Sequence, residues 1–310
     1  MADGIFNRDH APPIGRAEEL GEGIRVVTAG NGGPMTFTGT RTYIVGEGEV
    51  AVIDPGPADP AHLDAILAAL APGERVSHIL VTHSHLDHSP LARPLAERTG
   101  APVIAFGDSR AGRSAQMDAL AASGAHLGGG EGIDAGFAPD IAVADGEDVA
   151  GRGWSLRALH TPGHLSNHLA FGWDARGAVF SGDHVMGWAT TLVSPPDGDL
   201  SAFMSSLERM RGQGQVFYPG HGAPLEVPDA MIDHQLAHRR GREAQILAAL
   251  ADGEADIAAL TARIYADVDP VLHPAAARNV FAHLIDLVGR GLVEADGGIS
   301  RDARFARLQG

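Results

Sequence analysis

The stretch that decides the fold spans residues 82–88 and reads Thr82-His83-Ser84-His85-Leu86-Asp87-His88. It directly follows an apolar, β-branched run at 76–82, which predicts a buried strand. Side chains at the carboxyl end of such a strand lie where α/β sheets place their sites. His83 and His85 are two residues apart, so an extended segment turns both rings to the same side. Because crowded imidazoles would repel one another once protonated, a bound cation explains this cluster better than a solvated loop does.

Three later segments supply more groups of the same kind. Each puts a histidine or an aspartate at the end of a predicted strand, beside a glycine that lets the backbone approach closely. They read Thr161-Pro162-Gly163-His164, Ser181-Gly182-Asp183-His184 and Tyr218-Pro219-Gly220-His221-Gly222. Taken singly, each segment is compatible with an ordinary loop. Together with the first cluster, and in this order, they indicate one metal-binding site.

The surrounding pattern alternates strands with helices, which predicts an α/β layered body. Residues 1–23 are expected to be irregular, and the glycine-rich segment 123–139 to be a long surface loop. The predicted strands are 24–29, 41–45, 49–54, 76–82, 102–106, 154–159, 169–171, 178–180 and 216–218. The predicted helices are 59–70, 90–98, 108–122 and 200–211.

The composition changes near Pro228, where the pattern becomes nearly all helical. Helices are expected over 234–250, 255–265 and 274–290, followed by a β-hairpin over 292–308. Three helices followed by a hairpin are typical of a winged-helix module. The sequence therefore predicts two domains, residues 1–227 and residues 228–310.

Composition excludes several classes of protein. With 44% hydrophobic and 20% charged residues among 310, the chain is expected to be globular. It has no cysteine and no lysine, which excludes thiolate ligands, cysteine nucleophiles and Schiff-base chemistry. A net charge of -16 disfavours a broad nucleic-acid surface. No apolar run approaches the length of a membrane span, so we expect no membrane partner and a cytoplasmic location.

These motifs resemble the metallo-β-lactamase superfamily over roughly residues 36–250. The resemblance implies an α/β fold, the four-layer αββα sandwich, with a dinuclear metal site and, here, a C-terminal winged-helix domain. It assigns His83, His85 and His164 to the first metal, Asp87, His88 and His221 to the second, and Asp183 to a bridge between them. Zinc is the expected metal for both positions, with iron or manganese as alternatives, because the ligands are nitrogen and oxygen.

Further segments resemble the LACTB2-like branch of that superfamily. No cysteine is present as a second-site ligand, so the cysteine-containing true β-lactamases do not fit. One departure is Arg41, where asparagine is expected in many relatives. The segments are Gly39-Thr40-Arg41-Thr42-Tyr43, Pro195-Pro196 with Gly198-Asp199-Leu200, and His238-Arg239 with Arg242-Glu243.

The resemblance implies a dinuclear metal-dependent hydrolase, in which a hydroxide shared by the metals attacks the ester, thioester or lactone carbonyl of a small acyl substrate. Asp87 would orient the water and accept its proton. The alternative is a metal-dependent endoribonuclease that cleaves single-stranded RNA. Two further hypotheses are a mononuclear iron oxygenase of thiol persulfides, and a DNA-binding protein with a degenerate site. The complete ligand set argues against the last one.

Other residues receive weaker predictions. Asp54, at the end of a strand, either orients a metal-binding histidine or caps its own turn. His168 and His184 are expected to support the site rather than bind metal. The tail is expected to be a lid or a homodimerisation element near the site. Met186, Trp188, Leu192 and Phe203 are candidates either for an apolar acyl pocket or for packing between the tail and the body. Arg239, Arg240 and Arg242 are expected to pair with nearby acids, with an anion clamp as the alternative.

Overall fold

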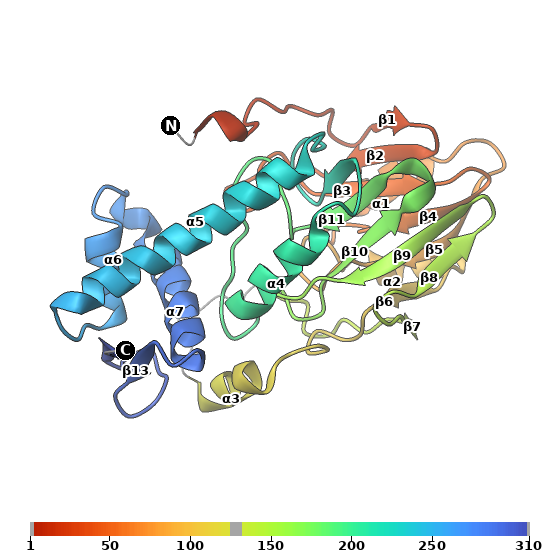
Figure 1. Ribbon diagram of the computed structural model, residues 1–310. Coiled ribbons are helices and arrows are strands. Elements are labelled where there is room, and N and C mark those ends of the chain that lie inside the picture. Colours follow the sequence, from red (N-terminus) through yellow and green to blue (C-terminus); the bar gives the residue numbers. More distant parts are fainter. Residues whose placement is uncertain (1–2, 125–131, 309–310) are drawn as a thin grey trace.

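The computed structural model describes residues 3–124 and 132–308, and its body consists of two β-sheets that face each other (Figure 1). The first sheet has the strand order β1-β2-β3-β4-β5-β6-β7 and the second the order β12-β11-β10-β9-β8. The first comprises β1 Ala17–Gly21, β2 Ile24–Thr28, β3 Arg41–Val45, β4 Glu49–Ile53, β5 Arg75–Leu80, β6 Val103–Ala105 and β7 Ile141–Ala142. The second comprises β8 Asp148–Gly151, β9 Trp154–His160, β10 Leu169–Trp173, β11 Ala178–Gly182 and β12 Val216–Pro219.

Helices cover the outer face of each sheet. Helices α1 (Pro60–Ala68) and α2 (Ala92–Thr99) share a buried apolar cluster with the first sheet. Helices α4 (Leu200–Met210) and α5 (Pro228–Ala249) share another with the second sheet. A third cluster, which includes Tyr43, Trp154 and Phe171, fills the space between the sheets. These layers confirm the expected αββα sandwich.

Strand direction brings the expected site to one edge of the sandwich. Strands β4 and β5 are parallel, and so are β11 and β12, so the carboxyl ends within each pair lie side by side. The segments that follow β4, β5, β11 and β12 carry Asp54, the 82–88 stretch, Asp183 and His221.

Two local predictions were wrong. Residues 17–21 form the edge strand β1, paired with β2, although the polar N-terminal region was expected to be irregular. Helix α3 covers only Ala115–Ser123, because Ser114 caps it by accepting a hydrogen bond from the backbone of Met117. Residues 108–114 before it form turns rather than helix.

The tail contains α6 (Ile257–Ile264), α7 (His273–Gly289) and a hairpin of β13 (Val293–Ala295) and β14 (Phe305–Arg307). Its own apolar cluster also takes in the end of α5 and two residues of α3. Figure 1 shows α5 running from the sandwich to the tail, with α7 beside α4. Since α5 packs in two clusters, the boundary between residues 227 and 228 stays a prediction.

Short 3-10 turns lie at Asp3–Ile5, Asp174–Arg176, Leu250–Asp252 and Pro270–Leu272.

Among the described residues, no helix is long and apolar enough to cross a membrane. The cytoplasmic location stays a prediction. The surface loop expected over 123–139 lies partly outside the described residues, and the part from 132 onward is irregular except for short turns and an isolated bridge between Ile133 and His85.

Candidate metal centre

The four segments singled out in the sequence converge in the structure on two adjacent groups of side chains that could each hold a metal ion. The first group contains His83, His85, His164 and Asp183, and the second contains Asp87, His88 and His221. Within each group, one candidate ligand atom per residue lies within 4.8 Å of every other. The structure thus brings together all seven residues predicted as ligands.

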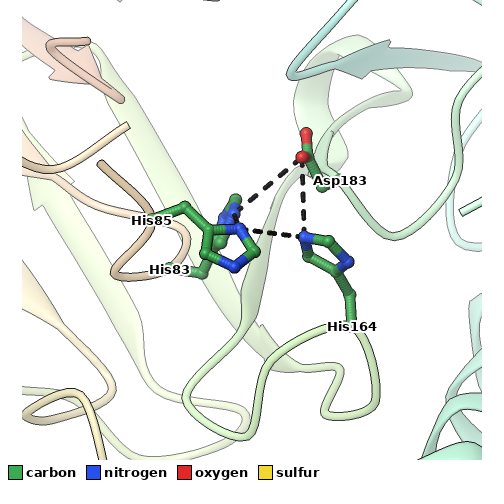
Figure 2. Close-up of side chains that lie close together, drawn as sticks. All are labelled: His83, His85, His164 and Asp183. Atoms are coloured by element: carbon green, nitrogen blue, oxygen red, sulfur yellow. Dashed lines mark hydrogen bonds and ion pairs between the residues drawn. The ribbon is translucent and has the colours of Figure 1, made fainter. Parts of the chain in front are cut away.

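Three imidazoles and one carboxylate form the first group (Figure 2). The Nδ1 atom of His85 lies 2.9 Å from Nε2 of His83 and 3.1 Å from Nε2 of His164. The Oδ2 atom of Asp183 lies 3.6 Å from Nε2 of His164 and 3.9 Å from Nε2 of His83. The nitrogen atoms of three rings therefore point at one small space.

Hydrogen-bond partners assign the tautomers of these rings. The Nδ1 atom of His164 lies 2.7 Å from the carbonyl oxygen of Leu192, which can only accept, so this nitrogen carries the proton. Thr82 donates its hydroxyl proton to Asp54 and therefore accepts from Nδ1 of His83, 2.9 Å away. In both rings the Nε2 atom keeps its lone pair, as metal binding requires.

The second group lies directly beside the first. Nε2 of His221 is 3.1 Å from Oδ2 of Asp87 and 3.4 Å from Oδ2 of Asp183, and Nε2 of His88 is 3.2 Å from the same Asp87 oxygen. Oδ1 of Asp183 lies 3.4 Å from Nε2 of His88. Asp183 therefore faces both groups, the position that a bridging ligand needs.

Asp54 supports the second group from behind. Its Oδ2 atom lies 2.9 Å from Nδ1 of His88, and its carboxylate accepts from both the backbone N–H and the hydroxyl of Thr82 at 2.7 Å. The residue has φ of 52°, an uncommon conformation for a side chain other than glycine. Of the two predicted roles for Asp54, the structure confirms the orientation of a histidine.

The histidine pKa values differ between the two groups. Burial lowers the pKa of His85 to about 3, and neighbouring imidazoles push it the same way. Burial also lowers the pKa of His83 and His164. For His88 and His221 burial acts downward as well, but the carboxylates of Asp87 and Asp183 outweigh it and raise the pKa, to about 9 for His221.

These side chains fit a pair of metal ions. In the first group, the Nε2 atoms of His83 and His164 both keep lone pairs, and both face Nδ1 of His85, at 2.9 and 3.1 Å. A neutral His85 carries at most one proton there and can satisfy only one of them, whereas a bound cation accepts from all three nitrogens. In the second group, the partly buried carboxylate of Asp87 and the adjacent buried carboxylate of Asp183 face His88 and His221, and two negative charges so close together favour a bound cation. The donor set is nitrogen and oxygen alone, which suits zinc, iron and manganese.

Close backbone packing keeps these groups together. A Cβ atom at Gly220 would lie 2.3 Å from Oδ1 of Asp183 and 2.7 Å from Cε1 of His88. Any other residue at this position would displace both side chains. The glycine beside His221 is therefore a requirement of the site, as the sequence pattern indicated.

The two supporting histidines behave differently from each other. His168 bonds Thr161 through Nδ1 and accepts from the backbone N–H of Asp183 at 3.2 Å, so it positions the bridging residue. His184 stacks on Phe203 at 4.8 Å, and neither of its ring nitrogens has a hydrogen-bond partner among the described residues. Neither histidine belongs to a metal-binding group, as predicted.

A pocket of about 480 Å³ opens over both groups. His85, Asp87, His164, Asp183 and His221 lie in its wall. Most of the other residues in its wall are apolar: Pro34, Met35, Leu165, Met186, Trp188, Ala189, Leu192 and Ala275. Met186, Trp188 and Leu192 were candidates for this wall. Phe203 is not in the pocket wall, because it is buried beneath His184.

The three arginines considered for an anion clamp do not reach the pocket. Arg239 is buried and donates to Asn279 and to the carbonyl oxygen of Thr191. Arg240 pairs with Glu208 at 2.9 Å. Arg242 lies over the ring of Tyr265 and bonds Gln245. Successive helix positions point in different directions, so one sequence cluster could not supply one clamp.

Sequence reasoning missed several supporting groups. Thr40 donates to Oδ2 of Asp87 at 3.1 Å, and its motif was noted without a role for this residue. The carbonyl oxygen of Leu192, which orients His164, leaves no sequence signal. Arg41, the departure from relatives, is buried and contacts His10 and Thr28 rather than the pocket.

Comparisons with known proteins agree with this geometry. Residues 35–221 match the family model "Metallo-beta-lactamase superfamily", and residues 257–302 match "Beta-lactamase associated winged helix domain". The chain is 32% identical over 253 residues to the atrochrysone carboxyl ACP thioesterase AgnL7 of Paecilomyces divaricatus, covering 80% of this chain and 71% of that protein.

Two further similarities cover nearly the whole chain. A beta-lactamase-like protein 2 homolog of Caenorhabditis elegans is 28% identical, over 92% of this chain and 90% of its own length. The crystal structure of a metallo-beta-lactamase family protein from Thermus thermophilus superposes with a TM-score of 0.74 at 25% identity. That similarity covers 94% of this chain and all of the other chain.

Proposed function

The chain belongs to the metallo-beta-lactamase superfamily, and from this we propose that it is a dinuclear hydrolase of a small acyl thioester, ester or lactone. A metal-dependent hydrolase follows from the family and from its thioesterase relatives. The observation that carries the choice of substrate is the pocket, which has a mostly apolar wall and opens over both metal-binding groups. Its volume of about 480 Å³ is that of a site for a small molecule.

His83, His85 and His164 would hold the first metal, Asp87, His88 and His221 the second, and Asp183 would contact both. We propose zinc for both positions, since these ligands suit it. When bound, the ions lower the pKa of a coordinated water to about 7 and stabilise negative charge on the substrate's carbonyl oxygen.

The protein's own groups assign the remaining roles. The side chain of Asp87 is 23% exposed and that of Asp183 is 8% exposed, so Asp87 is the carboxylate with better access to the pocket. We assign Asp87 to orienting the attacking water and accepting its proton. Thr40 donates to Oδ2 of Asp87 and holds the carboxylate in place. The apolar side chains around it would bind the acyl chain and exclude bulk water.

A cleavage panel on the metal-loaded protein tests this function. It contains thioesters, esters, lactones, a β-lactam and a single-stranded RNA, each with wild type and with Asp183→Ala. The control is Asp174→Ala, which removes an exposed carboxylate paired with Arg157. We expect acyl cleavage that falls to background in Asp183→Ala and is unchanged in Asp174→Ala.

RNA cleavage that disappears in Asp183→Ala, with no acyl turnover, would instead establish the endoribonuclease. The net charge of -16 stands against that alternative. Homodimer formation stays a prediction, and sedimentation of the same sample tests it.

A further inference from the structure

One part of the pocket wall comes from the tail rather than from the sandwich. Ala275 and Arg278, both on helix α7, lie among the residues that line the pocket. The wall of the pocket over the metal-binding groups therefore includes an arginine. Sequence analysis assigned no role to this arginine.

Arg278 has no partner of its own among residues 3–124 and 132–308. Its Nε atom is buried and makes no hydrogen bond there, and no described carboxylate forms an ion pair with it. Other arginines of the tail are paired, such as Arg290 with Glu243 and Asp286. A partly buried cation to which the described residues supply no counter-charge is costly, so an anionic group that enters the pocket is the natural partner.

The acidic residue Asp197 also lines the pocket, but its charge is already compensated. Its Oδ1 atom lies 2.8 Å from Arg113, whose side chain is only 12% exposed. The other pocket carboxylates, Asp87 and Asp183, belong to the metal-binding groups. Two divalent ions would outweigh those two negative charges, so Arg278 adds to an excess of positive charge in the loaded pocket.

Contacts of the neighbouring residue fix the turn of α7 that carries Arg278. The next residue, Asn279, donates to the hydroxyl of Tyr265 at 2.7 Å and accepts from Arg239. Arg239 also donates to the carbonyl oxygen of Thr191, in the loop whose residues Thr190 and Leu192 line the pocket. The turn of α7 that carries Arg278 is thus tied to α5 and to the pocket loop, as a preorganised recognition site requires.

We propose that Arg278 binds an anionic group of the acyl substrate, a carboxylate or a phosphate, and so makes the enzyme selective for anionic substrates. The planar guanidinium forms paired hydrogen bonds with either group. This proposal rests on the proposed hydrolase function and narrows its substrate class. It also gives the winged-helix tail a place in substrate recognition.

Two pairs of thioesters test the proposal and locate the anion. The first pair is S-glutaryl-N-acetylcysteamine and its terminal amide, which differ in a carboxylate on the acyl side. The second is S-acetyl-phosphopantetheine and S-acetyl-pantetheine, which differ in a phosphate on the thiol side. The kcat/KM ratio of each anionic compound to its neutral partner is measured in wild type, Arg278→Met, Arg278→Lys and the control Arg240→Met.

We expect wild type to prefer the anionic member of at least one pair by about 10- to 100-fold, the range for a hydrogen bond to a charged group. Arg278→Met should abolish this preference and leave turnover of the neutral member within about threefold. Arg278→Lys should keep part of it, and Arg240→Met all of it. The pair that responds identifies the side of the substrate that carries the charge.

A binding measurement gives a second readout. If the first pair responds, the thioether analogue of the glutaryl compound, with a methylene in place of the carbonyl, is titrated by calorimetry. If the second pair responds, the corresponding thioether, S-ethyl-phosphopantetheine, is titrated instead. The proposal is supported if the analogue binds Arg278→Met more weakly than wild type and binds the control Arg240→Met as tightly as wild type. Wild-type turnover with equal anionic-to-neutral ratios in wild type and Arg278→Met would overturn it. No turnover of any thioester, ester or lactone by wild type would instead overturn the proposed function.

Discussion

Replacing Asp54 by asparagine should weaken metal binding mainly at the second group. The aspartate oxygens face donors only: the N–H and hydroxyl of Thr82, and Nδ1 of His88. An asparagine amide turns one of these oxygens into an NH₂ group, which in either orientation meets a donor. Asparagine tolerates the positive φ of 52° at this position, so the backbone should keep its shape.

The effect on metal affinity follows from the tautomer of His88. With an NH₂ group against Nδ1, the ring keeps its proton on Nε2, the atom that faces Asp87 and Asp183. Either the ring keeps this tautomer and Nε2 loses the lone pair that a metal needs, or the proton moves to Nδ1 and the hydrogen bond between His88 and residue 54 is lost. Losing such a supporting partner lowers metal affinity by about 10- to 100-fold. That range corresponds to about 1.4–2.7 kcal/mol.

Competition with a chromophoric chelator measures both stepwise dissociation constants for zinc. We expect the second site to be weakened by about 10- to 100-fold in Asp54→Asn and the first site by less, because Asp54 reaches His83 only through the hydroxyl of Thr82. Asp59→Asn serves as control, because Asp59 accepts a backbone N–H at the start of α1, away from the metal-binding groups. Two unchanged constants, or an equal loss at both sites, would refute the assignment of Asp54 to His88.

Two further predictions concern stability. Phe281 is 1% exposed in the tail's apolar cluster. Phe281→Ala should therefore lower the free energy of unfolding, measured by urea denaturation, by about 3–5 kcal/mol. A loss below about 1 kcal/mol would contradict that packing. Burial lowers the pKa of His283 to about 3, with Arg239 and Arg242 acting in the same direction, and neither ring nitrogen has a partner among the described residues. Wild type should therefore lose stability as pH falls from about 6.5 towards 3, because the unfolded state takes up the proton first. The His283→Leu variant should lose less stability over that pH range. Its stability at pH 7 should match or exceed that of wild type, because the substitution removes no hydrogen bond. Equal slopes of stability against pH in the two proteins would contradict this prediction.

The metal-binding residues could be predicted because their signal is local. Residues 82–88 hold four donors in one turn after a strand, and each later donor follows a strand beside glycine. Parallel strands then bring their carboxyl ends to one edge. The edge strand β1 escaped prediction because its exposed, polar residues carry no apolar pattern, and only pairing with β2 makes it a strand.

The interior face of α5 could not be predicted. Arg239 and Arg240 are adjacent and chemically identical, yet one is buried against Thr191 and the other pairs with Glu208 at the surface. A helix rotates its side chains by about 100° per residue, so the neighbours that cover each face decide their fates. Those neighbours are α4, α7 and the pocket loop, which lie far away in the chain.

By itself, the sequence determined the chemistry of the site: which donors are present, that no thiolate or lysine takes part, and which layered fold presents them. Such information is carried by residue types and short spacings. Only the tertiary structure decided which ring nitrogens keep lone pairs, which apolar residues form the pocket wall, and that Arg278 of the tail reaches it. The physical reason is that a tautomer or a pocket wall depends on contacts between residues distant in sequence, such as Leu192 with His164 and α7 with the sandwich.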